Sequence, residues 1–270
     1  MQPFFSYYGG KWKLARQYGR PRCEHVIEPF AGGAGYSVNW EPKKITLIER
    51  NPVVYGVWKY LQRVSPREVM NLPSNISHID ELPPRVCQEA KWLIGFWFDV
   101  GPSEPAESRS NWARTPRLSA FYWSETIKRR IASQVDHIRH WDIIEGSWEQ
   151  APDIKAHWHI DPPYNNSAGR LYDCNKVDYS ALAKWCKCRW GFVQVCENDG
   201  ATWLPFRPRS VLTTHRGRGY SVEALYESSN WSRPPERSTP DRRRRGRAAA
   251  VIRRRSRKAM RNTQQSRRAS

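Results

Sequence analysis

The chain lacks the features that assign a protein to the membrane or to export. None of its 270 residues belongs to an apolar run near the roughly 20 residues that cross a bilayer. The first residues, MQPFFSYYGGKWK, have neither the charged start nor the apolar segment of a secretory signal. We therefore expect a protein that is not exported and has no membrane partner.

Cysteine is sparse and scattered. Of the six cysteines, only Cys186 and Cys188 lie close together in the sequence. A structural zinc site needs about four ligands with paired spacing. His157 and His159 share one face of a predicted strand, but the sequence offers them no third ligand. Free thiols, no disulfide framework and no metal are expected.

Acidic and aromatic residues are nearly absent from the C-terminal segment. Residues 233–270 hold 15 Lys and Arg against 2 Asp and Glu, so they carry +13 of the total formal charge of +19. Every Trp, Tyr and Phe lies in the first 232 residues. A segment of this composition cannot bury a core, and we expect a disordered basic tail at 233–270.

The body alternates strand-like and helix-like segments. Strand-like apolar stretches lie within 25–38, 43–51, 157–161 and 190–198, and helical spacing occurs at 52–64 and 178–189. This alternation predicts an α/β protein with a parallel sheet, which binds ligands at the carboxyl ends of its strands. Glu49 and Asp161 stand at two such ends.

Residues 65–148 interrupt the alternation. Proline-rich connectors (ELPPR, VGPSEPAES) separate two helical pieces, CQEAKWLIGFWFDV and SETIKRRIASQVDHIRHW. Between the pieces lies SRSNWARTPRLSAFYW, which is basic and aromatic without a clear period. We predict a sheet domain formed by 1–64 and 149–232 with an insertion at 65–148.

A glycine-rich turn follows the first predicted strand. In EPFAGGAG, Gly32, Gly33 and Gly35 allow a ligand to approach the backbone, and the helix that follows favours negative charge. Glu49, about 20 residues further on, is placed to accept hydrogen bonds from ribose hydroxyls. The spacing does not fit the GxGxxG pattern, which argues against NAD. Taken alone, the turn is equally well a tight connection.

The stretch HWHIDPPYNN ends a predicted strand in a carboxylate and two prolines. Asp161 and the carbonyl of Pro162, stiffened by Pro163, form a rigid pair of acceptors that matches the two N–H groups of an exocyclic amine. The ring of Tyr164 is suited to stack on a base drawn out of a duplex. The alternative is a proline-stiffened loop with a capping aspartate.

Four motifs in this order resemble those of the DNA adenine-N6 methyltransferases of the Dam-like (alpha) group, especially phage-type members. The motifs are FSYYGGKWKLA, IEPFAGGAGYSV, LIERNP and IDPPY, and the similarity, which extends to VQVCEN and GYSVEALYES, covers about residues 4 to 227. The resemblance implies a Rossmann-like methyltransferase sheet that binds S-adenosylmethionine. It also implies that the insertion is a small, mostly helical target-recognition region.

The resemblance also implies roles for individual residues. The residues expected to bind S-adenosylmethionine are Tyr8, Lys11, Phe30, Gly32, Gly33, Gly35 and Glu49. Lys11 would lie near the carboxylate of the cofactor, and Glu49 would bind its ribose. The expected catalytic motif consists of Asp161, Pro162, Pro163 and Tyr164. Within this motif, Asp161 and the Pro162 carbonyl would hold the target amine.

We expect double-stranded DNA as the partner of a cytoplasmic, monomeric enzyme in a bacterial host cell or prokaryote. The candidates for reading base edges lie in the insertion and are Arg109, Trp112, Arg114 and Arg117. The alternative is that this loop is only solvated or contacts phosphates without reading bases. The tail would add salt-sensitive phosphate contacts. The competing functions are an RNA, cytosine-N4 or glutamine methyltransferase, and a non-catalytic DNA-binding protein that acts through its tail.

Overall fold

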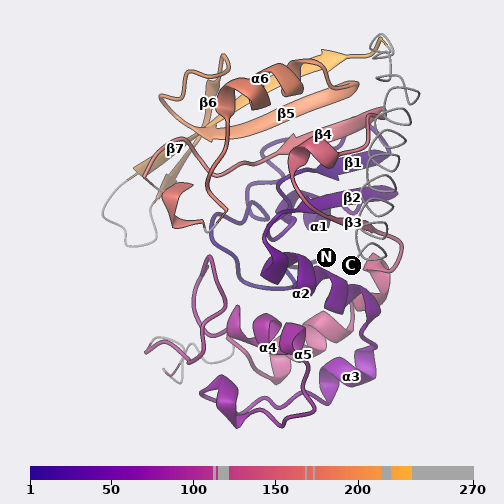
Figure 1. The fold of residues 1–270 in the computed structure, drawn as a ribbon, viewed down its shortest axis with the longest axis vertical. Coiled ribbons are helices and arrows are strands. Elements are labelled where there is room, and N and C mark those ends of the chain that lie inside the picture. The colour runs from indigo at the N-terminus through magenta and orange to yellow at the C-terminus, as the bar shows by residue number, and fades with distance from the viewer. Residues whose placement is uncertain (112–113, 115–121, 168, 173, 214–219, 233–270) are drawn as a thin grey trace, which may run out of the picture. The chain divides into compact units, whose positions relative to one another are not determined.

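The structure, a computed structural model, describes residues 1–232 apart from 112–113, 115–121, 168, 173 and 214–219. Its strands are β1 (His25–Glu28), β2 (Lys44–Glu49), β3 (Asp142–Glu145), β4 (Ala156–Ile160), β5 (Gly191–Asn198), β6 (Arg207–Thr213) and β7 (Tyr220–Asn230). They form one seven-stranded sheet in the order β3-β2-β1-β4-β5-β7-β6 (Figure 1).

The first five strands of the sheet run parallel, and β7 is antiparallel to both of its neighbours. The direction in which successive strands are added reverses between β1 and β4, as in doubly wound sheets, whose ligands bind at that point. The predicted Rossmann-like α/β sheet is confirmed.

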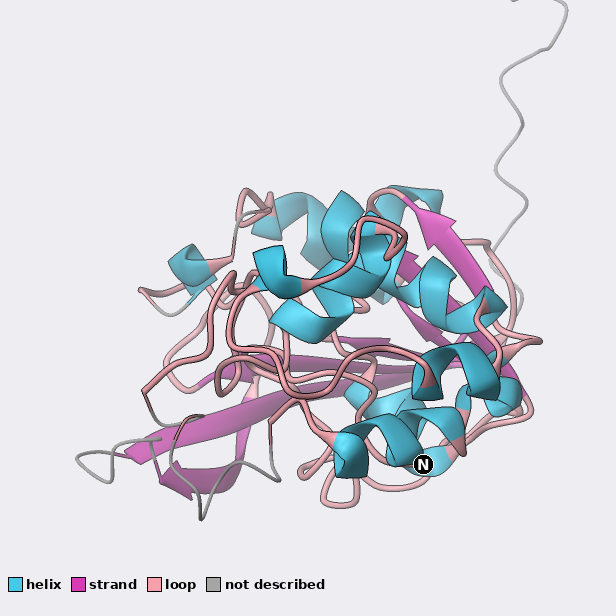
Figure 2. Ribbon diagram, turned by 90° about the horizontal axis from the view of Figure 1, so that it is seen from below, coloured by secondary structure: helices cyan, strands magenta, loops and turns pink. Residues whose placement is uncertain are grey.

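Helices cover both faces of the sheet (Figure 2). The α-helices are α1 (Gly35–Trp40), α2 (Pro52–Arg63), α3 (Pro66–Met70), α4 (Gln88–Gly95), α5 (Glu125–Ala132) and α6 (Tyr179–Lys187). Short 3-10 turns are η1 (Ile79–Glu81), η3 (Val135–Ile138), η4 (Trp148–Gln150) and η5 (Gly169–Leu171). None of these described helices combines the length and the hydropathy of a membrane-crossing segment.

Local signals in the sequence explain where the main helices begin. The side chain of Asn51 accepts a hydrogen bond from the Val53 amide at 2.9 Å, and Pro52 occupies the first turn of α2. Asp178 caps α6 in the same way, through the Ala181 amide at 3.0 Å. Both helices therefore start directly after a side chain that satisfies an otherwise unpaired backbone donor.

The strands divide their side chains between two hydrophobic layers. Leu47 of β2 packs in one layer with Trp58 of α2, whereas the next residue, Ile48, packs in the other layer with Leu182 of α6. This division follows from the two-residue period of a strand, which sends successive side chains to opposite faces. The sheet is consequently buried on both sides, which its near-continuous apolar sequence requires.

The inserted helices share a core with the sheet domain. Leu93 of α4 and Ile127 of α5 belong to the same buried cluster as Trp58 of α2. The predicted boundary at 148 needs a correction, because β3 lies within 65–148 and yet pairs with β2 in the sheet. Local patterns indicate β3 only weakly, since it is an edge strand whose residues are only partly buried or exposed. A role of the insertion in target recognition stays a prediction.

Replacing Leu182 with alanine should lower the free energy of unfolding by about 2–5 kcal/mol, because this side chain is fully buried between α6 and the sheet. Lys184, exposed on the same helix, is the matched control, and Lys184→Ala should change the stability by less than about 0.5 kcal/mol. Urea denaturation followed by circular dichroism measures both. Equal effects of the two changes would contradict the assignment of α6 to the core.

Candidate active site

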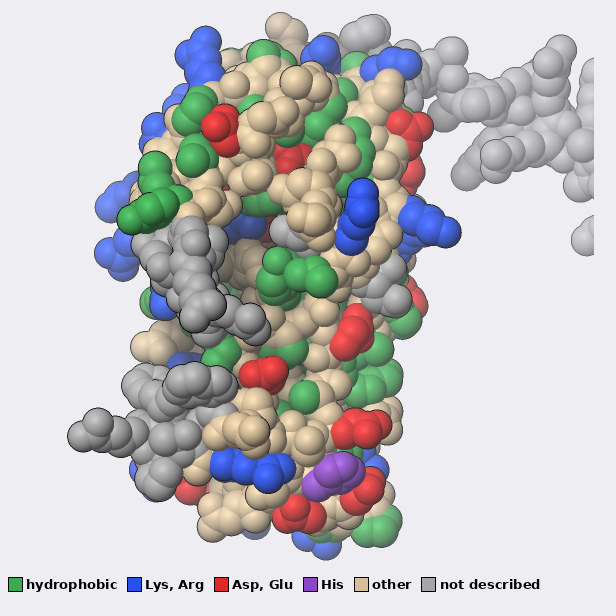
Figure 3. All heavy atoms as spheres, turned by 90° about the vertical axis from the view of Figure 1, so that its left-hand side faces the viewer, with side chains coloured by type: hydrophobic (Ala, Val, Ile, Leu, Met, Phe, Trp, Pro, Cys, Tyr) green, Lys and Arg blue, Asp and Glu red, His purple; other side chains and the backbone are tan. Residues whose placement is uncertain are grey.

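A cavity opens at the carboxyl edge of the sheet. Its empty volume, open mouth included, is about 860 Å³, in the range of small-molecule sites. The face of the molecule at this edge is hollowed, with charged side chains inside the hollow (Figure 3). The cavity is lined by nine residues predicted from the sequence: Tyr8, Lys11, Phe30, Gly32, Gly33, Gly35, Glu49, Asp161 and Pro163.

The glycine turn is shaped by the N-terminal segment that packs on it. Gly32 has φ +45°, and a Cβ atom there would lie 2.8 Å from the Tyr7 ring. A Cβ at Gly35 would lie 2.5 Å from the amide nitrogen of Trp12. Trp58, fully buried on α2, also holds the turn in place, because its Nε1 donates a hydrogen bond to the Gly32 carbonyl at 2.8 Å. Larger side chains at Gly32 and Gly35 are excluded by this packing.

Buried carboxylates stand at the ends of β1 and β2. Glu49 accepts hydrogen bonds from the amides of Gly32 (2.7 Å) and Asn51 (2.8 Å), which joins β2 to the glycine turn. Glu28 accepts one from the Ser37 amide at 2.7 Å. Burial raises the pKa of Glu49, and it raises the pKa of Glu28 to about 7. Both carboxylates line the cavity.

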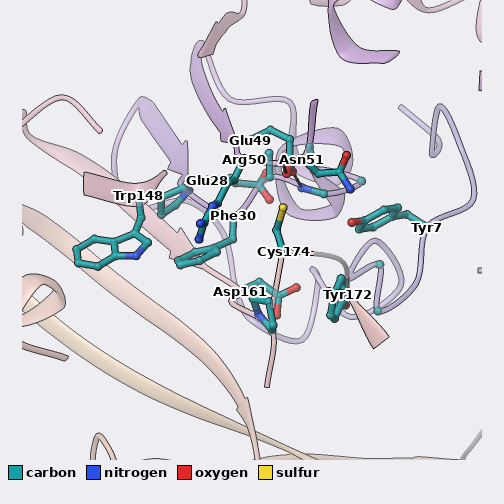
Figure 4. A pocket seen from close by; sticks show the side chains of 18 of the residues that line it. Tyr7, Glu28, Phe30, Glu49, Arg50, Asn51, Trp148, Asp161, Tyr172 and Cys174 are labelled. Carbon is teal, nitrogen blue, oxygen red and sulfur yellow. Dashed lines mark hydrogen bonds between the residues drawn. The ribbon is translucent and has the colours of Figure 1, made fainter. Parts of the chain in front are cut away.

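Sequence reasoning did not single out Glu28. The available signal was its position, since Glu28 is the acidic last residue of an apolar strand, as Glu49 is in the next strand. Figure 4 shows Glu28, Glu49 and Asp161 around the same cavity, with Phe30 and Trp148 on one side and Tyr172 on another.

The third carboxylate, Asp161 after β4, is paired with Lys11. The Lys11 Nζ atom lies 2.9 Å from each carboxylate oxygen, donates a hydrogen bond to Oδ2, and donates another to the Gly9 carbonyl at 3.0 Å. The Oδ1 atom is buried and accepts no hydrogen bond from the described residues. Burial raises the pKa of Asp161 to about 6, although the Lys11 charge acts in the opposite direction.

Tyr164 lies beside the cavity and is not among the residues that line it. Its hydroxyl is 2.7 and 2.8 Å from the two carboxylate oxygens of Glu223, a buried residue of β7. The Tyr18 hydroxyl donates to the same carboxylate at 2.7 Å. One side of the Tyr164 ring faces the Lys11 ammonium, 4.8 Å from the ring centroid. Stacking of Tyr164 on a base stays a prediction.

A different tyrosine contributes to the cavity wall. Tyr172, in the segment that follows the predicted catalytic motif, lines the cavity, and its hydroxyl donates to the Tyr8 carbonyl at 3.1 Å. Pro162 is buried and does not line the cavity, and the carbonyl of Pro163 accepts a hydrogen bond from the Tyr179 hydroxyl at 2.7 Å. The segment after Asp161 is thus tied to α6 on one side and to the N-terminal segment on the other.

The two strand histidines have packing contacts. His159 stacks on Tyr36 with ring centroids 4.3 Å apart, and the His157 Nδ1 atom accepts a hydrogen bond from the Arg22 amide at 3.1 Å. Burial lowers the pKa of each histidine to about 3, so both are neutral at physiological pH. Within the described ranges, no group of three His, Cys, Asp or Glu side chains could hold a metal ion.

Two of the four predicted base-reading residues, Arg109 and Arg114, lie within the described ranges. Arg109 is partly buried, and its guanidinium donates to the carbonyls of Ser74 (3.0 Å) and Trp123 (2.6 Å). Both bonds come from the Nη2 atom and join two backbone segments of the insertion. Base reading by Arg109 stays a prediction. Arg114 is exposed. Trp112 and Arg117 lie outside the described residues.

No protein-family model and no curated protein matches the chain. Among solved structures, a provisionally assigned methylase from Haemophilus influenzae has 11% identity and a TM-score of 0.34, over 81% of this chain and 85% of that one. A provisionally assigned methyltransferase from Escherichia coli has 9% identity and a TM-score of 0.32, over 81% of each chain. A conserved Streptococcus pyogenes protein of unassigned function has 10% identity and a TM-score of 0.34, over 76% of this chain and 86% of that one. Similarities this low carry no argument about function, which rests on the residues of the chain itself.

A matched pair of glycine substitutions tests the packing of the turn. Gly35→Ala should lower the free energy of unfolding by about 1–3 kcal/mol, because its Cβ would overlap the backbone of Lys11 and Trp12. Gly33→Ala should be nearly neutral, since its Cβ would meet only the Tyr7 Cβ at an ordinary 3.4 Å. Urea denaturation of both variants measures the difference. Equal stabilities would mean that the N-terminal segment does not pack on the turn.

Proposed function

We propose that the protein is an S-adenosylmethionine-dependent methyltransferase that methylates the exocyclic N6 amine of adenine in DNA. The observation that carries this proposal is the placement of Asp161. Its carboxylate follows β4 at the point where the strand order reverses and shares a cavity with the glycine turn and Glu49. Its Oδ1 atom accepts no hydrogen bond from the described residues, and Lys11 contacts it as an ion pair at 2.9 Å. Such an oxygen is suited to accept a hydrogen bond from an amine.

The cavity suits the chemical groups of the cofactor. Glu49, already oriented by two amides, has further lone pairs for the hydroxyls of a ribose. Phe30 and Trp148 supply apolar surface for a purine ring. Glu28 supplies a carboxylate for an ammonium group. The sulfonium of the bound cofactor would provide a methyl group that a nitrogen nucleophile can take.

The chain's own residues would prepare the nucleophile. The lone pair of an aromatic amine is delocalised into the ring, and acceptors at both N–H groups localise it on the nitrogen. Asp161 would be one acceptor, and the Pro162 carbonyl is the other predicted one. Attack of this nitrogen on the methyl carbon would leave the carbon–sulfur electron pair on sulfur, and one N–H proton of the methylated amine would pass to solvent. Holding the reacting atoms in line supplies much of the rate.

The choice of DNA adenine rests on the sequence. An aspartate at position 161 fits adenine within the resembled family, in which serine accompanies cytosine N4 and asparagine accompanies protein and several RNA substrates. The tail, with its +13 charge, is suited to a polyanion. A non-catalytic DNA-binding protein would have no need for two buried carboxylates and a third, partly buried one around a single cavity.

Asp161→Asn should reduce methyl transfer by at least about a thousandfold while the protein stays folded, because an amide is a weaker acceptor than a carboxylate. Long-read sequencing of DNA from cells that express the wild-type protein identifies the methylated base and its sequence context. Tritium-methyl transfer to that DNA then measures the rate of each variant.

Asp199→Asn is the control for this experiment. Asp199 is exposed and follows β5 as Asp161 follows β4, so its replacement should leave the rate unchanged. Full turnover by Asp161→Asn would contradict the assignment of Asp161. Methyl groups found on RNA or on cytosine, with adenine in DNA unmodified, would replace the proposed substrate.

Cofactor affinity should depend on pH through Glu28. The ionised carboxylate is the form that pairs with an ammonium, and burial holds the pKa of Glu28 at about 7. The affinity should therefore rise as the pH increases through 7. Below pH 7 the affinity should fall by up to about tenfold for each pH unit. Calorimetric titration of S-adenosylmethionine from pH 5.5 to 8.5 measures this profile. Glu28→Gln should flatten it, and an unchanged profile would assign the dependence to another group.

A further inference from the structure

We infer that Lys11 exchanges partners during the reaction cycle: it holds Asp161 before the cofactor binds and releases Asp161 to take the carboxylate of the cofactor. This inference deepens the proposed function and rests on it. It makes the amine-binding acceptor available only after the cofactor has entered.

The Lys11 ammonium already has three close neighbours. Two N–H groups point to Asp161 and to the Gly9 carbonyl, at 2.9 and 3.0 Å. The ring of Tyr164 lies on a further side, 4.8 Å away, and Glu223 holds that ring in place. A new anionic partner therefore cannot simply be added; one of the existing contacts has to break.

The other lining residues leave an incoming carboxylate no comparable buried partner. The inner cavity presents the carboxylates of Glu28, Glu49 and Asp161. Among the described lining residues Lys11 is the buried cation, whereas Arg50 and Lys176 are exposed. Because a buried carboxylate needs a counter-charge, the α-carboxylate of the cofactor should be drawn to Lys11.

Asp161 is the contact that should be released. The Gly9 carbonyl belongs to the backbone of the segment that carries Lys11, so it moves with the lysine. The Asp161 carboxylate, by contrast, gains a new partner when the target amine arrives. While Lys11 lies 2.9 Å from both carboxylate oxygens, it occupies the position that the amine needs. Exchange of one carboxylate for another keeps the lysine paired throughout.

Asp161→Asn tests the exchange by a gain of affinity. S-adenosylhomocysteine is the probe, because it keeps the carboxylate and lacks the sulfonium charge that Asp161 would attract. Since an amide holds Lys11 less tightly, Asp161→Asn should bind this probe about tenfold more tightly than the wild type. 5′-Methylthioadenosine, which lacks the amino-acid end, should bind both proteins equally. Calorimetric titration of the full chain gives all four constants.

A second substitution separates the exchange from a general electrostatic effect. Lys11→Met should weaken S-adenosylhomocysteine, and Asp161→Asn should have no further effect in that background. Thermal unfolding reports whether each variant is folded. If Lys11→Met is not folded, the exchange is still tested by comparing the affinities of Asp161→Asn for S-adenosylhomocysteine and 5′-methylthioadenosine. Unchanged or weaker S-adenosylhomocysteine binding by Asp161→Asn would overturn the exchange. Failure of the wild type to bind either ligand would instead refute the proposed function.

Discussion

The burial of negative charge at one edge of the sheet is the constraint on which this structure depends. Glu28, Glu49 and Asp161 end or follow three neighbouring parallel strands, so their carboxylates converge where the strand order reverses. Buried carboxylates are costly unless they are paired or hydrogen-bonded. Backbone amides satisfy the first two, and the ammonium of Lys11 satisfies the third.

This constraint gives the N-terminal segment its place in the fold. Lys11 must reach Asp161, which lies 150 residues further along the chain. To do so the segment crosses the carboxyl edge of the sheet and packs on the glycine turn, where Gly35 leaves room for its backbone. The segment that completes the charge balance thereby also forms a wall of the cavity. The stability of the fold and the shape of the cavity are coupled here, because both need the same path of the chain.

The insertion is attached to the sheet domain through packing and through hydrogen bonds to carbonyls. α4 and α5 share the buried cluster of α2, and Arg109 joins two backbone segments of the insertion. The Tyr8 amide also donates a hydrogen bond to the Pro102 carbonyl at 3.0 Å. A change in the insertion would therefore be felt by the cavity-lining segment around Tyr8. This attachment links the insertion to a segment that lines the cavity.

The sequence by itself determined the parallel sheet, its main helices and most of the cavity. Apolar strands, Asn51 and Asp178 as helix caps, and the glycine turn act over a few residues, so local patterns reveal them. Edge strand β3 was missed because it is barely buried and carries little apolar signal.

Only the tertiary structure decided which charged side chains meet. It paired Lys11 with Asp161, bound Tyr164 to Glu223 and joined Arg109 to the carbonyl of Ser74. The local sequence around a long charged side chain is the same whether that side chain faces solvent or binds a carbonyl. Its partner depends on contacts between segments far apart in the chain, which no local pattern contains.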